Sequence, residues 1–344
     1  MTPIPDLWDA EPGYLNTASY GLPPRPAWDA LQAALADWRG GRTSWEDWAE
    51  TGERSRRAFG RLVGADAADV AIGSQVSALV GLIAASVPDG SRVVLPEIEF
   101  ASNLFPWLVH AHRGVEVVTV PPGRSLVDAV DERTDVVAYS VVQSATGAVT
   151  DMAAVSAAAE AHGALTVVDA TQAVGWLPVD TAHADALVCS AYKWLMAPRG
   201  TAFLVVDPAL AERMTPLAAG WYAGEDVHSS YYGPPLRLAK DARRFDVSPG
   251  WFDWVGTAAA LDVVHSIGVA ALHEHDVTLA NRFRAGLGLP PSNSAIVSVD
   301  WPDAAARLER AGIRAATRAG SLRAAFHAYT TESDVDTAVA ALTR

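Results

Sequence analysis

Residues 165–200 read LTVVDATQAVGWLPVDTAHADALVCSAYKWLMAPRG, and their pattern of apolar and polar residues indicates the fold class. It holds two short apolar runs, 165–168 and 186–189, whose length and boundaries are typical of buried strands rather than helices. Similar runs alternate with alanine-rich helical stretches through most of the first 210 residues. That alternation predicts an α/β fold, with a parallel sheet covered by helices on both faces.

The same patterns predict the secondary-structure elements in the rest of the chain. The expected strands of the main sheet are 70–72, 92–95, 115–120, 136–142, 165–168, 186–189 and 202–206, and the expected helices are 27–38, 77–86, 103–112 and 152–161. After Pro208 the pattern changes to a Gly-, Tyr- and Pro-rich loop (220–235), a helix (255–266), three short strands (295–299, 313–319 and 322–328) and a final helix with a Thr331–Asp334 capping box. We therefore expect an N-terminal arm (1–25), a large α/β domain (26–250) and a small α+β domain (251–344).

Composition excludes several classes of partner. The 344 residues carry a formal net charge of −14, which disfavours binding to nucleic acid or to an anionic membrane. No apolar run approaches the roughly 20 residues of a membrane span, and the first residues lack the basic start of a signal peptide. The single cysteine, Cys189, excludes an internal disulfide and a cysteine-based metal cluster. We expect a cytoplasmic protein that binds neither nucleic acid nor membrane, and no metal.

Three local features fall where an open parallel sheet binds ligands, at the carboxyl ends of its strands. Asp169 ends a buried strand, although it could instead cap the next helix. Lys193 follows another strand among apolar neighbours, where loss of solvation would make its amine nucleophilic, and only Lys193 and Lys240 are lysines in this chain. Gly73-Ser74-Gln75-Val76 leads from a strand into a helix and could cradle a phosphate, or simply cap the helix.

Taken together, the three features match the needs of pyridoxal phosphate. Asp169 would pair with the pyridine nitrogen, Lys193 would hold the aldehyde as a Schiff base and move the Cα proton, and Ser74, Gln75 and Val76 would bind the phosphate. A nucleotide-binding α/β protein would instead need a GxGxxG or GxxxxGK[ST] pattern, and neither occurs.

The motifs around these residues resemble a known family. Asp169–Ala173, Ser190–Lys193 and Ala197–Gly200, in that order, are similar to the class V aminotransferase family, which includes cysteine desulfurases and kynureninases. The similarity runs across essentially the whole chain. It implies the fold of fold-type-I pyridoxal-phosphate enzymes, in which a large domain with a mainly parallel seven-stranded sheet between helices joins a smaller α+β domain.

The resemblance also implies roles for residues elsewhere in the chain. Phe100 would stack on the cofactor ring, Ser144 would lie beside the 3-hydroxyl, and Gln172 would hydrogen-bond it. Ser190 would help to hold the phosphate, and Tyr192 would be a further phosphate-binding or orienting group. Arg323 would grip the substrate carboxylate, which a guanidinium matches bidentately, with Arg318 as a weaker candidate for the same task. The N-terminal segment with Asn16, Ala18 and Tyr20 would enter the substrate site. The stretch from Arg244 to Trp251 would reach a partner subunit's phosphate through Ser248 or Trp251, so we expect a homodimer with shared active sites.

Two departures from the family narrow the reaction. Only Ala319–Leu322 separates Arg318 from Arg323, so the loop cysteine of desulfurases is absent, and Cys189 lies in a buried strand. Phe100 stands where desulfurases typically carry a histidine, so Lys193 must carry most proton transfers, with Tyr192 or Tyr20 as possible helpers. We expect an enzyme acting on an amino acid or amine by transamination or β-elimination, the latter as in the C–S lyases of ergothioneine biosynthesis. An amino-acid racemase or epimerase and a non-catalytic binding protein of the same fold remain alternatives.

Overall fold

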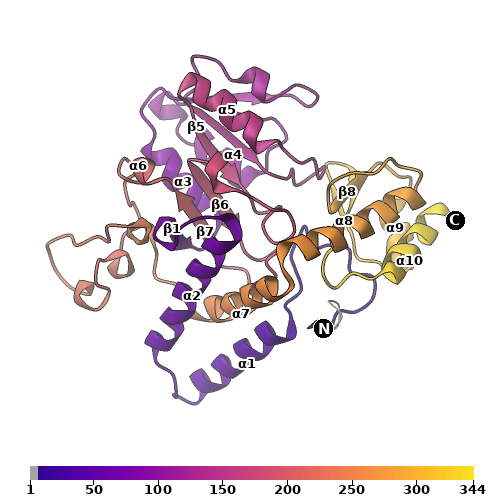
Figure 1. Cartoon of the computed structure of the whole chain (residues 1–344), viewed down its shortest axis with the longest axis horizontal. Helices are drawn as coiled ribbons and strands as arrows, with labels where there is room; N and C mark the ends of the chain where they lie inside the picture. Colours follow the sequence, from indigo (N-terminus) through magenta and orange to yellow (C-terminus); the bar gives the residue numbers. More distant parts are fainter. Residues whose placement is uncertain (1–6) are drawn as a thin grey trace.

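The computed structural model describes residues 7–344, and its centre is a seven-stranded sheet. The strand order is β1-β7-β6-β5-β4-β2-β3 (Figure 1). All neighbouring pairs are parallel except those made by β7, which runs antiparallel to both β1 and β6. The strands are β1 (Val70–Gly73), β2 (Arg92–Pro96), β3 (Glu116–Val120), β4 (Val136–Ser140), β5 (Leu165–Asp169), β6 (Ala186–Ser190) and β7 (Ala202–Val206). The expected α/β fold with a mainly parallel seven-stranded sheet is therefore confirmed.

Helices cover both faces of this sheet because its central strands are apolar on both sides. Val167 packs in the core with α3 (Val76–Ser86) and α4 (Ala101–Leu108), whereas its neighbour Val168 packs in the opposite core. That second core contains residues of α2 (Trp45–Val63), α5 (Met152–His162) and α7 (Trp251–Ile267). Alternation of side chains along a strand accounts for this division. The short helix α6 (Pro208–Ala211) follows β7.

Three helices form a layer at one side of the molecule. Helix α1 (Arg25–Arg39) and α2 both pack against α7 (Figure 1). Trp254 of α7 is buried against Phe203 of β7, and Phe252 contacts Trp38 of α1. Helix α7 thus joins the large domain's packing, although the sequence groups it with the small domain.

The C-terminal part has its own small sheet and core. Strands β8 (Ile296–Val299), β10 (Ser321–Ala325) and β9 (Ala316–Arg318) lie in that order and pair antiparallel. Helices α8 (Val269–Gly286), α9 (Ala304–Arg310) and α10 (Glu332–Thr343) accompany them (Figure 1). The expected capping box at the start of α10 is present, because Thr331 and Asp334 exchange both of its hydrogen bonds.

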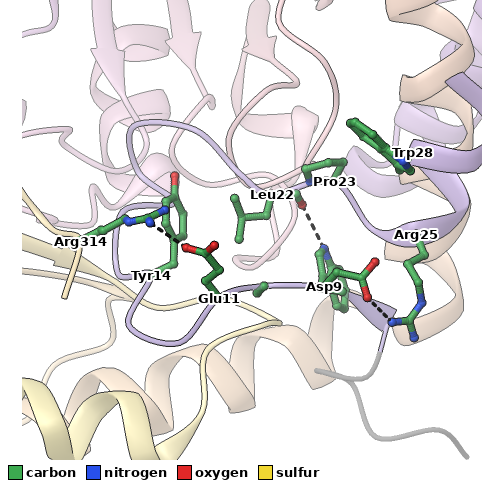
Figure 2. A pocket seen from close by; sticks show the side chains of 10 residues that line it. Asp9, Glu11, Tyr14, Leu22, Pro23, Arg25, Trp28 and Arg314 are labelled. Carbon is green, nitrogen blue, oxygen red and sulfur yellow. Dashed lines mark hydrogen bonds and ion pairs between the residues drawn. The ribbon is translucent and has the colours of Figure 1, made fainter. Parts of the chain in front are cut away.

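The N-terminal segment joins the two parts. Tyr14 bridges to Arg314, and Asn16 bridges to Ala325 of β10. Figure 2 shows this segment with its ion pairs, Glu11 with Arg314 and Asp9 with Arg25 of α1. Residues 1–6, which include the start of the expected arm and the region compared with a signal peptide, lie outside the described residues.

Within residues 7–344, no single helix is long and apolar enough to cross a membrane. The pair α7 and α8 reaches that threshold only when the two helices are taken together, and they are bent by 81° relative to each other. The expected loop 220–235 contains only short 3-10 turns, at Trp221–Ala223 and His228–Ser230.

Candidate active site

Strand ends bring Asp169 and Lys193 to one cavity. Strands β5 and β6 are parallel, with Asp169 opposite Val188, so the residues that follow both strands emerge at the same edge of the sheet. The cavity there has a volume of about 350 Å³. Of the residues predicted from the sequence, it is lined by Ser74, Gln75, Val76, Phe100, Ser144, Asp169, Gln172, Ser190, Tyr192 and Lys193.

Lys193 is buried in the turn after β6. Burial penalises its charged form and lowers the pKa of its amine to about 8, although Asp169 acts in the opposite direction. The N-terminal segment closes over this turn, since Gly21 donates its N–H to the Tyr192 carbonyl at 2.8 Å. A β-carbon at Gly21 would lie 2.0 Å from the Lys193 carbonyl oxygen, so only glycine permits this approach.

Asp169 is buried beside Lys193. Its Oδ1 accepts a hydrogen bond from the Thr171 backbone N–H at 2.8 Å. Burial raises the pKa of this carboxyl, while the bonds from Thr171 and the charge of Lys193 oppose the rise. The Thr171 hydroxyl in turn accepts from the Ser190 N–H at 3.0 Å and thereby ties the two strand ends together.

Gln172 connects several walls of the cavity. Its Oε1 accepts from the Trp194 indole N–H at 2.8 Å. Its Nε2 donates to the Ser144 hydroxyl at 3.1 Å and to the Ala18 carbonyl at 2.9 Å. Both amide hydrogens of Gln172 are therefore engaged within the chain, and this network fixes Ser144 and the N-terminal segment relative to Lys193.

Arg323 belongs to β10 of the small domain, and its side chain is only 1% exposed. It donates through Nη1 to the Ser144 carbonyl at 2.8 Å and through Nη2 to the Ser19 hydroxyl at 2.8 Å. Arg318 donates to the same Ser19 hydroxyl at 3.2 Å, and Ser19 donates to Asn16 Oδ1 at 2.7 Å. Arg323, Arg318 and Asn16 thus meet at the Ser19 hydroxyl, although none of the three is among the residues that line the cavity, and their expected roles stay predictions.

Of the two tyrosines expected near the cofactor, Tyr192 lines the cavity and Tyr20 does not. The Tyr192 ring lies 5.7 Å from the Lys193 amine and 4.9 Å from the Arg199 guanidinium carbon. Burial raises the pKa of the Tyr192 hydroxyl, with Arg199 opposing the rise. Tyr20 is 53% exposed and contacts the ring of Tyr14.

The segment from Arg244 to Trp251 does not line this cavity. Asp246 anchors it within the chain through a buried ion pair with Arg56 of α2 at 2.6 Å and a bond from the Ile72 N–H at 2.8 Å. Ser248 is exposed, and the Trp251 ring packs against Trp45. The expected contact with a partner subunit stays a prediction.

The sequence analysis did not assign a role to Glu99, which precedes Phe100. It is buried and accepts hydrogen bonds from the backbone N–H groups of Ser140 and Phe100, both at 2.8 Å. Burial, with a smaller contribution from Asp169, raises the pKa of this carboxyl to about 7. The signal was available, because Glu99 follows β2 as Asp169 ends β5.

A buried histidine was also missed. His327 follows β10, and its Nδ1 is hydrogen-bonded to Asp276 Oδ2 of α8 at 2.7 Å, while its Nε2 lies 2.9 Å from the Trp194 carbonyl oxygen. That carbonyl belongs to the residue after Lys193, so the small domain holds the lysine turn directly. A second cavity, of about 360 Å³, lies between the N-terminal segment, α1 and Arg314 (Figure 2), and neither Lys193 nor Asp169 lines it.

Sequence comparison identifies a protein family to which the chain belongs, and several relatives. The family model described as "Aminotransferase class-V" matches residues 46–306. The chain is 29% identical to the "Uncharacterized aminotransferase YcbU" of Bacillus subtilis over 86% of this chain and 84% of the relative. It is 25% identical to a "Probable cysteine desulfurase" of Methanothermobacter thermautotrophicus over 68% of this chain and 60% of the relative. It is 28% identical to the "Isopenicillin N epimerase" of Streptomyces clavuligerus over 78% and 72% of the two chains.

Solved structures share the fold. The structure described as the cystine C-S lyase C-DES in complex with cysteine persulfide superposes with a TM-score of 0.85 and 22% identity, covering 97% of each chain.

Proposed function

Because this chain belongs to the class V aminotransferase family, whose cofactor is pyridoxal phosphate, we propose that it is an enzyme acting on an amino acid with Lys193 as the covalent anchor of that cofactor. The observation that carries the proposal is the pairing of a buried lysine and a buried aspartate in one cavity. The lysine's pKa is lowered to about 8, which supplies a neutral amine near physiological pH.

The residues of the cavity fit the cofactor in three respects. Asp169 is buried in the wall of the cavity, where its carboxylate could receive a protonated pyridine nitrogen. Helix α3 begins at Val76 with no side-chain cap, so its first N–H groups are open to a phosphate. The Phe100 ring lies 5.5 Å from the Lys193 amine, where it could cover one face of a bound ring.

When bound, the cofactor supplies an electron sink for a substrate that loses its Cα proton. Lys193 would take that proton and return it, because no histidine lines the cavity. Asp169 would keep the pyridine nitrogen protonated, and Arg323 would hold the substrate carboxylate. Glu99 would position Phe100 through its bond to the Phe100 N–H.

The reaction classes that this site supports are transamination and β-elimination of a C–S bond. Persulfide chemistry needs a mobile cysteine, whereas Cys189 is fully buried in β6, and burial raises the pKa of its thiol well above the usual range. Cysteine desulfurases are among the relatives, so the case against desulfuration rests on these residues alone. Racemisation is the second candidate, favoured by the similarity to an epimerase over 78% of the chain.

Product analysis in a single turnover separates these reactions. The holoenzyme would be mixed with an S-alkyl-L-cysteine, and keto acid, ammonia, thiol and the D-enantiomer would be measured. Elimination yields equal amounts of pyruvate, ammonia and thiol; transamination yields one keto acid per site without ammonia. Alanine and a persulfide on Cys189 from L-cysteine would contradict the proposal, and absence of any product with a broad amino-acid panel would favour a binding protein.

We further propose a homodimer whose sites are completed by the segment from Arg244 to Trp251. Ser248 is exposed and could reach a partner, although Trp251 packs inside its own chain. Two inactive variants, Lys193→Ala and Ser248→Trp, would be mixed under subunit exchange. A shared site regains activity in the hybrid, whereas a fully active monomer in light scattering would contradict the idea.

A further inference from the structure

Two arginines lie side by side on one face of the small sheet. Strand β9 is joined to β10 by Ala319 and Gly320, which have φ angles of 47° and 84°. Positive φ at both central residues is the geometry of a tight two-residue hairpin, which holds the two strands in fixed register. In that register Arg318 lies opposite Ser321 and Arg323 opposite Ala316. Because residues 321 and 323 point to the same face, Arg318 and Arg323 do so as well.

Both guanidinium groups converge on a single neutral acceptor. Arg323 donates to the Ser19 hydroxyl at 2.8 Å and Arg318 donates to it at 3.2 Å. The same hydroxyl donates to Asn16 Oδ1 at 2.7 Å, so its one hydrogen and both of its lone pairs are engaged. Ser19 therefore positions the two cations and cannot neutralise them.

Neither cation has a counter-ion in the part of the chain that the structure describes. The ion pairs within residues 7–344 include neither Arg318 nor Arg323, and the Nε of Arg323 is buried with no hydrogen-bond partner. Burial and the neighbouring charge of Arg318 disfavour the charged form of Arg323 and lower the pKa of its guanidinium to about 10. Two like charges held together in this way favour a ligand that brings two negative charges.

The two arginines lie at different depths. Arg323 is 1% exposed, whereas Arg318 is exposed to solvent. Arg323 therefore lies deeper in the structure than Arg318. A substrate that directs its amino group to Lys193 and its α-carboxylate to Arg323 would extend its side chain toward Arg318.

We propose that Arg318 is a specificity-determining residue that binds a second anionic group, in the simplest case a carboxylate, on the side chain of the amino-acid substrate. The proposal rests on the proposed function. It assigns the substrate to the class of amino acids with an acidic side chain or with an acidic group on the sulfur that leaves. A single α-carboxylate shared by both arginines is the competing arrangement, and the two differ in what a change of side-chain charge does.

The test uses two ligands that differ in charge alone. S-carboxymethyl-L-cysteine and S-carbamoylmethyl-L-cysteine have nearly the same shape, but only the first carries a side-chain carboxylate. Stopped-flow mixing with the holoenzyme gives a dissociation constant from the first spectral change of the cofactor, before turnover. We expect the carboxymethyl compound to bind roughly ten- to a hundredfold more tightly, as a charge-assisted hydrogen bond implies.

Substitutions of single arginines identify the side chain that causes the preference for the carboxymethyl compound. Arg318→Gln should abolish the preference by weakening the carboxymethyl compound only, Arg318→Lys should keep part of it, and Arg323→Gln should weaken both compounds. Arg310→Gln on α9 removes one exposed positive charge from the same domain and should leave the preference intact.

Equal loss of both compounds in Arg318→Gln would overturn the proposal, because Arg318 would then serve the α-carboxylate. Equal binding of both compounds by the unmodified protein would do the same and leave the proposed function standing. If no amino acid, including L-alanine, changed the cofactor spectrum, the proposed function would fall together with the inference.

Discussion

The pKa of the Lys193 side chain can be measured without substrate or cofactor. Burial lowers its pKa from 10.5 to about 8, with Asp169 opposing and Arg323 adding to the shift. At pH 7 a pKa of 8 leaves roughly one amine in ten neutral, whereas an ordinary lysine would have roughly three in ten thousand. The structure therefore predicts about a three-hundredfold gain in nucleophilic amine at this position.

The composition of the chain makes the assay simple. Lys193 and Lys240 are its only lysines, and the Lys240 side chain is 86% exposed, so it serves as an internal reference. The protein freed of cofactor would be labelled briefly with acetic anhydride at a series of pH values, and mass spectrometry would quantify acetylation at each lysine. Only the neutral amine reacts, so labelling of Lys193, normalised to its own plateau, should rise with pH through a midpoint near 8. Normalisation removes the effect of its restricted access.

Two variants should move this midpoint in opposite directions. Asp169→Asn removes the charge that favours the ammonium form, so the midpoint should fall below that of the unmodified protein. Arg323→Gln removes a repelling charge, so the midpoint should rise. A Lys193 midpoint near the ordinary value of 10.5, or shifts of the same sign in both variants, would refute the electrostatic account of this lysine.

Three further outcomes follow from the same geometry. Asp169→Ala should reduce turnover far more than cofactor retention, measured by kinetics and by dialysis followed by absorbance, because the phosphate contacts remain; near-normal turnover would contradict the role of Asp169. Cys189→Ala should leave the products unchanged and cost about 1 kcal/mol in urea unfolding. His327→Ala should cost about 3–5 kcal/mol in the same assay, because it leaves Asp276 buried without its partner, whereas Asp276→Asn should cost clearly less since an amide can still accept from the ring. Equal losses in these last two variants would contradict the expectation that an amide at position 276 keeps the hydrogen bond to His327.

The parts of the fold and site that the sequence predicts are those with local signals. Apolar runs of three to seven residues are sufficient to assign the strands of the main sheet. Asp169 and Lys193, which follow two of these runs, share an edge because parallel strands put their carboxyl ends together. The reversed direction of β7 has no such signal, since an apolar strand reads the same in either direction. Helix α2 is not identified from the sequence, although Ser44 caps it and accepts from the Glu46 N–H.

The parts of the site that the sequence does not predict depend on contacts between segments that are far apart in the chain. Arg323 meets Ser19 across 304 positions, and His327 meets the Trp194 carbonyl across 133. No periodicity links such positions, and each contact depends on how the small domain docks on the large one. His327 looks, in sequence, like one more polar residue after a strand, yet it is fully buried and holds the backbone beside Lys193.

The residues that are recognisable from local sequence and those that are placed by long-range contacts have different proposed chemical roles. The residues proposed to hold the cofactor, Asp169 and Lys193, lie at the end of β5 and just after the adjacent strand β6, and are recognisable locally. The groups proposed to select a substrate, Arg318 and Arg323, lie on a hairpin of the other domain and contact the N-terminal segment through Ser19. Leu322 and Ala324 of the hairpin strand β10 pack in a different core from Ala170 and Ala191, which flank the aspartate and the lysine. A change in the hairpin or in Ser19 should therefore alter which substrate binds while leaving the lysine and aspartate in place. That independence explains how relatives described as an aminotransferase, a desulfurase and an epimerase can share one family, and it makes the β9–β10 hairpin the place where this chain's own specificity should be sought.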